Sequence, residues 1–121
     1  MSKKVLPKKK VISAGDMSGN LTSSVVHIYQ IDNFYVQCNI LSGSPTGTLA
    51  VQVSGDHEED MQGVVTVAGN WITVTSSAVT AGAGSPFFFD INQSSAQYAR
   101  LIYTATSGSG SLDAFIGGKE I

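Results

Sequence analysis

Apolar and polar residues alternate along one segment near the middle of the chain. Leu49, Val51 and Val53 fall on one face of segment 48–54, and its polar or small residues fall on the other. A period of two is typical of a β-strand with one face on a core. The preceding Gly43–Gly47 favours a tight turn, because its proline presets φ and its last glycine permits positive φ. The pattern therefore predicts a turn followed by a half-buried strand.

The same alternation recurs along the rest of the chain. Runs rich in Gly, Ser, Asn and Pro separate the segments at intervals of about 8–12 residues, as in β-sandwiches. No segment has an apolar period near 3.6, so no helix is predicted. Together with 48–54 there are about eight expected strands: 25–31, 34–41, 64–68, 71–75, 87–91, 98–106 and 111–116.

Some strand pairs are predicted from the turns between the segments. Asp32-Asn33 and Gly69-Asn70 tolerate unusual φ values, so 25–31 should form a hairpin with 34–41, and 64–68 with 71–75. Segment 98–106 is expected to be the partner of 48–54. The predicted fold class is all-β, an antiparallel β-sandwich with an extended basic N-terminal arm. Jelly-roll and immunoglobulin-like strand orders give the same alternation, so both remain open.

The composition points to one domain with an unusually uncharged surface. At 121 residues the chain is large enough to bury its own core. Charged residues make up 13% of it, against roughly 25% in typical soluble domains. Such a surface suits a protein that packs against neighbours, and it also suits an extracellular β-domain.

Positive charge is concentrated at the N-terminus. The rest of the chain has two basic residues against nine acidic ones, so a basic arm precedes an acidic body. The predicted domains are a flexible lysine-rich arm at 1–20 and a β-sandwich at 21–121. The residues expected to contact a partner are Lys3, Lys4, Lys8, Lys9 and Lys10.

Three roles are open for this arm: a solvated tail, a contact with an acidic neighbour in an assembly, or a contact with nucleic acid. Binding to nucleic acid would be non-specific and salt-dependent, because no aromatic residue or arginine is interleaved with the lysines. No long apolar run follows them, so neither an export signal nor a membrane contact is expected. Synthesis in the cytoplasm follows as an expectation.

The chain offers few candidates for chemistry. The single cysteine, Cys38, alternates with Val36 and Ile40 and is expected to be a buried apolar residue. His27 and His57 have no second ligand or nucleophile at a metal-binding or catalytic spacing. The sequence therefore predicts no enzyme activity, no catalytic residue, no metal site and no cofactor.

Four further features leave alternatives open. The acidic run Asp56–Asp60 is expected to be a solvated loop tip, although its oxygens would suit a hard cation such as Ca²⁺. Trp71 is expected in the core, whereas an exposed indole would indicate a sugar-stacking platform. Phe87–Ile91 is apolar on both faces, as expected for a strand buried between two layers or covered by a subunit. Arg100 either contacts another subunit or faces water.

Four segments carry a family resemblance: Pro45–Ser54, Trp71, Phe87–Asp90 and Tyr98–Lys119. They match the patterns PTGTL-x-V-Q-x-S, a Trp-containing strand, aromatic-x-x-D/N, and a closing hairpin Y-x-R-L-x-Y-T-x-x-S-G-x-G-x-L-x-x-x-x-x-G-K. This order resembles a family of small virion proteins of tailed and other bacteriophages. The chain departs from the family between Ser54 and Trp71, where the family has a short Asn-Asp-Gly turn, and in its lysine arm.

The resemblance implies a β-sandwich with a structural role in a particle, no enzyme activity and no cofactor. The expected function is a bacteriophage virion structural protein, in the capsid, as a decoration or in the tail. It would act by self-assembly as a homo-oligomer with other virion proteins, after synthesis in the host cytoplasm. The alternative is a carbohydrate or host-surface binding module of the virion that uses the acidic loop and exposed aromatic residues: Trp71, Tyr29 and Tyr35.

Overall fold

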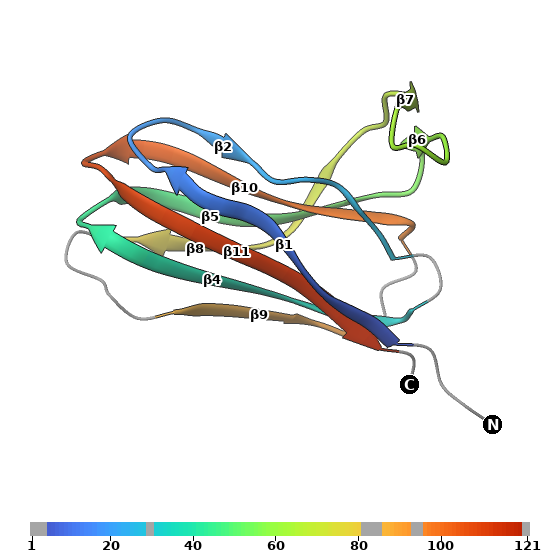
Figure 1. Cartoon of the computed structure of the whole chain (residues 1–121), viewed down its shortest axis with the longest axis horizontal. Helices are drawn as coiled ribbons and strands as arrows, with labels where there is room; N and C mark the ends of the chain where they lie inside the picture. The colour runs from blue at the N-terminus through green and yellow to red at the C-terminus, as the bar shows by residue number, and fades with distance from the viewer. Residues whose placement is uncertain (1–4, 29–30, 81–85, 93–95, 120–121) are drawn as a thin grey trace.

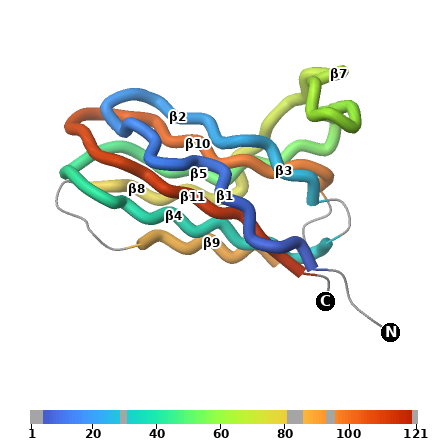
Figure 2. The backbone as a smooth tube through the Cα atoms, in the orientation of Figure 1, coloured from blue at the N-terminus to red at the C-terminus, as the bar shows by residue number. Residues whose placement is uncertain are grey.

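In the computed structural model, residues 5–28, 31–80, 86–92 and 96–119 are described, and they contain strands, turns and loops without a helix. These ranges accordingly hold no helix that could cross a membrane. Figures 1 and 2 show two layers of strands with a small hairpin beyond them. The strands are β1 (Val5–Asp16), β2 (Leu21–Thr22), β3 (Val26–His27), β4 (Asn33–Gly43), β5 (Thr46–Ser54), β6 (Glu58–Glu59), β7 (Val65–Val67), β8 (Ile72–Val79), β9 (Phe87–Ile91), β10 (Tyr98–Ser107) and β11 (Gly110–Lys119).

Two antiparallel sheets form a sandwich. Sheet A has the order β1-β11-β4-β9, and sheet B has the order β2-β10-β5-β8, with β3 also paired to β10. With β2 and β3 counted as one interrupted strand and the β6–β7 hairpin left aside, the strands run 1-8-3-6 in one sheet and 2-7-4-5 in the other. This is the strand order of a jelly roll, and it differs from the immunoglobulin order. The predicted antiparallel β-sandwich is confirmed.

The core lies between the two sheets and follows the predicted faces. Leu49 and Val51 of β5 are fully buried, and Val51 pairs in register with Leu101 of β10. On the opposite sheet Cys38 is fully buried and pairs with Ala114 of β11. Burial raises the pKa of the Cys38 thiol to about 12. The cysteine is therefore a small apolar core residue, as expected.

The expected pairing of 48–54 with 98–106 is confirmed, but the expected hairpins are wrong. β3 pairs with β10 in sheet B, whereas β4 lies in sheet A. Similarly, β7 pairs with β6, and β8 pairs with β5. The closing pair β10 and β11 also lies in different sheets. Alternation shows which residues share a face, but not which strand lies alongside, and in this fold several successive strands change sheets.

The segment expected to be a flexible arm at 1–20 is largely a strand. Val5–Asp16 is β1, which pairs with β11 at the edge of sheet A. The register shifts between Leu6 and Lys9, so Pro7 lies at a β-bulge, where a residue without an N–H is tolerated. Burial of apolar side chains around the lysines explains the strand. These buried residues are Val11, Ile12 and Met17.

Candidate functional site

The lysines expected to contact a partner lie along the edge strand β1. The Nζ atoms of Lys8 and Lys10 lie 5.2 and 5.8 Å from the centre of the Phe115 ring. Lys10 also forms an ion pair with Asp113 at 3.1 Å. Lys9 is exposed. The structure thus places these three charges on the rim of sheet A, while the other two candidates, Lys3 and Lys4, lie outside the described residues.

The exposed apolar residues are concentrated in one part of the chain. Among the described residues, nine large apolar side chains are exposed, and six of them lie between positions 61 and 74. They belong to the β6–β7 hairpin and to the first half of β8: Met61, Val64, Val65, Val67, Ile72 and Val74. We call these six residues the 61–74 apolar surface. Concentrations of exposed apolar area mark interaction surfaces, whereas single exposed apolar residues are ordinary.

Strand β8 adds an open sheet edge to this surface. It is the outer strand of sheet B and, among the described residues, pairs only with β5. Its sequence ITVTSSAV contains no charge and no proline. Ile72 is 65% exposed and Val74 is 45% exposed. An uncharged edge with unpaired N–H and C=O groups is a template for pairing with another chain.

The β6–β7 hairpin extends beyond the sandwich (Figure 1) and is fixed at its base. The Asp56 carboxylate accepts hydrogen bonds from the backbone N–H of Asn70 at 2.9 Å, the Asn70 side-chain amide at 3.1 Å and the Ser54 hydroxyl at 2.9 Å. The Asn70 N–H, followed by Ser54, lowers the pKa of Asp56. Gly69 is required here because a Cβ would collide with the backbone N of His57.

His57 is the buried centre of this base. It is 5% exposed, and its Nε2 lies 2.8 Å from Oε2 of Glu59. Its ring centroid lies 5.2 Å from that of Trp71 and 5.0 Å from that of Tyr98. The Tyr98 hydroxyl accepts the N–H of Glu59 at 3.3 Å. The expectation that Asp56–Asp60 is a solvated loop tip is therefore corrected, because this run fastens the hairpin to sheet B.

No cation site was found along this run. Within the part of the chain that the structure describes, no group of three His, Cys, Asp or Glu side chains could hold a metal ion. Asp60 uses its Oδ1 to accept the N–H groups of Gln62 and Val64, at 2.8 and 2.9 Å, inside the hairpin turn. At least two carboxylates of the run, those of Asp56 and Asp60, thus serve the local backbone.

Trp71 is neither an open platform nor a fully buried core residue. It is half-buried, and the Arg100 guanidinium lies 4.2 Å from the centre of its ring. Nε of Arg100 donates a hydrogen bond to Gln52 at 2.9 Å, and Gln52 donates one to Thr73 at 3.2 Å. Arg100 thus covers one side of the indole. The chain of hydrogen bonds from Arg100 through Gln52 to Thr73 links β10, β5 and β8. Tyr29, the second aromatic residue proposed for sugar binding, lies outside the described residues.

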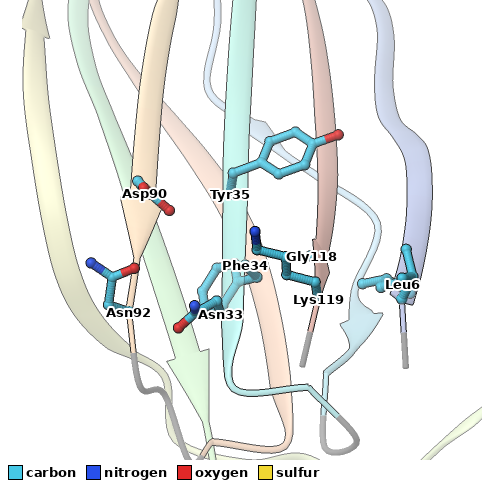
Figure 3. A pocket seen from close by; sticks show the side chains of 9 residues that line it. Leu6, Asn33, Phe34, Tyr35, Asp90, Asn92, Gly118 and Lys119 are labelled. Atoms are coloured by element: carbon cyan, nitrogen blue, oxygen red, sulfur yellow. The ribbon is translucent and has the colours of Figure 1, made fainter. Parts of the chain in front are cut away.

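A cleft of about 490 Å³ lies at one end of sheet A. Four strands contribute to it, β1, β4, β9 and β11 (Figure 3). Its apolar lining includes Leu6 and Phe34, and Lys119 points from β11 toward β4. The polar side chains around the cleft are Asn33, Tyr35, Asp90, Asn92 and Lys119.

A pair of stacked aromatic rings adjoins this cleft. The rings of Tyr35 and Phe88 are nearly parallel, 10° apart, with centroids separated by 5.3 Å. Gly117 makes room for this pair, since a Cβ there would lie 2.8 Å from the Tyr35 ring. Phe88 is 58% exposed, while Phe89 on the other face of β9 is buried. Of the two alternatives expected for 87–91, burial between two layers is wrong, because one face of β9 carries the exposed Phe88. Cover by another subunit stays a prediction.

Comparison with known proteins supports the fold. No protein-family model and no curated protein matches the chain. The SPBc2 prophage-derived protein YomS matches with a TM-score of 0.55 and 8% identity, over 98% of this chain and 96% of that one. A chain of the Bacillus endospore appendages, described as disulfide-linked pili, matches with a TM-score of 0.51 and 15% identity, over 100% of this chain and 93% of that one. The chain therefore shares its fold with a prophage-derived protein and with a pilus-forming protein.

Sequence reasoning missed both the cleft and the fastening of the hairpin. Both depend on residues that are distant in the chain, such as Tyr35 beside Phe88 and Asp56 beside Asn70. One signal was available for the cleft: the Gly117-Gly118 pair in a strand suggests the close approach of another group. For the 61–74 apolar surface, the signal was an apolar run directly after an acidic one.

Proposed function

We propose that the protein is a self-assembling structural subunit of a bacteriophage or prophage particle, in the capsid, as a decoration or in the tail. The observation that carries this proposal is the 61–74 apolar surface, with six exposed apolar residues on a projecting hairpin and an adjacent edge strand. Covering such a surface with a second copy would contribute ~25 cal/mol for each Å² of apolar area removed from water.

The base of the hairpin supports an assembly role. Hydrogen bonds to Asp56 and the packing around His57 hold the hairpin against sheet B. An interaction surface that is already ordered loses less conformational entropy when a partner binds. The six apolar residues are thus presented on a fixed support.

Two further features agree with a structural subunit. Only 13% of the residues are charged, so much of the surface can be covered by neighbours without removing many charges from water. Jelly rolls are frequent in viral capsids, although the fold also carries other functions. Contacts between subunits would not include disulfide bonds, because the single cysteine, Cys38, is fully buried. The proposal includes no catalytic step and no cofactor.

The lysines of β1 would provide a separate contact in such a particle. Lys8, Lys9 and Lys10 form a basic rim, while the 61–74 apolar surface adjoins the acidic run Asp56–Asp60. An acidic neighbouring protein or the phosphates of a packaged genome would suit this rim. Neutralisation of phosphate requires only positive charge, so this contact would weaken as salt increases.

The mass of the protein in solution tests the proposal. We expect light scattering to show an oligomer in the wild type and a monomer in a Val65→Lys/Val67→Lys variant, because two ammonium groups on β7 would have to be desolvated in the contact. Val5→Lys is the matched control, since Val5 is also exposed, at 68%, but lies on β1. Point variants are preferable to removal of residues 1–20, which would delete β1 and uncover β11.

Two results would count against the proposal. A wild type that remains monomeric at every accessible concentration would remove its basis. An oligomer that the β7 variant retains and the Val5→Lys control loses would place assembly on the basic rim. Electron microscopy of the oligomer should further show ordered rings, shells or filaments, as expected of a structural subunit.

A further inference from the structure

The cleft at the end of sheet A has a composition that self-assembly does not explain. Its polar groups are chemically mixed, with two amides, a carboxylate, an ammonium and a phenol drawn from β4, β9, β11 and the residue that follows β9. Asp90 and Asn92 lie on the β9 side and Lys119 on the β11 side (Figure 3). No ion pair joins Asp90 and Lys119 among those found for the described residues, which are Lys10–Asp113 and His57–Glu59. Both charges therefore remain available to a ligand.

The neighbouring aromatic pair adds a flat apolar surface. Tyr35 lines the cleft itself and stacks on Phe88, a residue that is 58% exposed. The absence of a side chain at Gly117 makes room for the Tyr35 ring. The site thus combines a flat apolar platform with hydrogen-bonding groups at its side. Small-molecule sites are typically concave, with volumes of about 300–1,000 Å³, and have a few polar groups that fix orientation.

This combination matches the chemistry of a sugar ring. A pyranose has apolar C–H faces and a rim of hydroxyl groups that both donate and accept hydrogen bonds. The amide of Asn92 can donate and accept, Asp90 can accept, and Lys119 can donate. A nucleic acid fits less well, because Asp90 would repel its phosphates and Lys119 is the only cation lining the cleft among the described residues.

We propose that this cleft binds a pyranose unit of a glycan, with its ring on the Tyr35–Phe88 pair and its hydroxyl groups toward Asp90, Asn92 and Lys119. This site is distinct from the 61–74 apolar surface and does not depend on the assembly role. It also differs from the glycan site expected around Trp71, which Arg100 covers on one side. The affinity for a single ring should be weak, with a Kd of about 1 mM or above, because one ring buries little area.

Nuclear magnetic resonance of the full-length, ¹⁵N-labelled protein tests this inference. The probes are N-acetylglucosamine and the methyl α-glycosides of glucose, galactose and mannose, each titrated separately. We expect at least one of them to shift the backbone amides of Asn33, Tyr35, Asp90 and Asn92 in a saturable manner. Asn92→Ala and Tyr35→Ala should each weaken binding at least about fivefold, which corresponds to ~1 kcal/mol.

Phe115→Ala is the matched control, because Phe115 also lies on the outer face of sheet A but packs under Lys8 and Lys10 and does not line the cleft. It should leave sugar binding unchanged. Asn92 is exposed, so its variant keeps the test valid even where Tyr35→Ala disturbs the fold. The inference is overturned by an absence of saturable shifts with all four sugars, or by shifts that persist unchanged in Asn92→Ala. A response of the same amides to oligothymidine but to no sugar would also overturn it.

Discussion

Two long edge strands of the sandwich, β1 and β8, differ in nearly every feature that controls pairing between sheets. β1 carries three consecutive lysines and Pro7, and its register with β11 shifts at three places. β8 carries no charge and no proline, and its register with β5 shifts once. Lysine, proline and bulges are the devices with which proteins prevent edge-to-edge association. The chain protects one long edge and leaves the other open.

The contrast between the two edge strands indicates where a partner is expected. Short strands end the sheets elsewhere: β9 has five residues, and β2 and β3 have two each. An open edge on a soluble domain is a risk of aggregation unless another chain covers it. Together with the exposed side chains of the β6–β7 hairpin, this leads us to expect the proposed assembly contact on the β8 side and a salt-dependent contact on the β1 side.

The largest effect is expected from charge on β8. In Ile72→Lys/Val74→Lys, association should weaken by about tenfold or more, which corresponds to ~1.4 kcal/mol or more, because a contact would have to desolvate two ammonium groups. Light scattering over a concentration series measures it. Lys9→Ile, the control on β1, replaces a charged residue by an apolar one. It should not increase association through β8.

A second change tests whether β1 is actively protected. Replacing Lys8, Lys9 and Lys10 by Thr would leave the strand pairing with β11 intact while removing the repulsive charge from the edge. We expect lower solubility and a broader distribution of masses than in the wild type. Unchanged solubility would mean that Pro7 and the bulges suffice to protect this edge.

The base of the hairpin should respond to acid. The folded-state pKa of Asp56 lies below its ordinary value of 3.8, chiefly because Asn70 donates its N–H. The ionised carboxylate therefore stabilises the hairpin base above about pH 4, and this contribution is lost as pH falls through the lowered pKa. Trp71 fluorescence should change in that range, and Asp56→Asn should abolish the transition. Glu58→Gln, a change at an exposed position two residues further along the chain, should leave it in place.

The smallest effect concerns backbone strain within β1. Ala14 has a φ of 48°, and its N–H donates to Asp113 at 2.8 Å. A non-glycine residue in this left-handed region costs ~1–2 kcal/mol. Ala14→Gly should raise the free energy of unfolding by only about 0.5–1 kcal/mol. The relief of backbone strain is partly offset, because glycine has more conformational freedom in the unfolded chain. Urea denaturation measures it, and Ala14→Val should lower stability instead.

Much of the fold could be predicted from local pattern. Alternation at Leu49, Val51 and Val53 located the strand and the face of β5, and the register with β10 agrees with it. The same reasoning fails for strand order, because turn residues such as Gly69-Asn70 do not always join strands that pair with each other. In the structure Asn70 serves instead as a hydrogen-bond donor to Asp56. A jelly roll arises from contacts between segments that are distant in sequence, and the local alternation of apolar residues does not predict which segments pair.

The candidate site was less predictable than the fold. The sequence shows the cluster of lysines but not that three of them lie on an edge strand. A charged run also forms a strand when apolar residues next to it, such as Val11 and Ile12, are buried. The acidic run suggested a solvated tip, although Asp56 and His57 organise the hairpin base. Short-range composition identifies charge, whereas the partner of each charge is set by the fold.

Hydrogen–deuterium exchange of the full-length protein, followed by mass spectrometry at low and high protein concentration, tests the contrast between β1 and β8 most directly. Backbone N–H groups on an unpaired edge exchange readily, and pairing with another chain protects them. We predict that peptides covering 61–79 gain protection as concentration increases, while peptides covering 5–16 do not. Protection gained at 5–16 and not at 61–79 would contradict the assignment of assembly to the open edge.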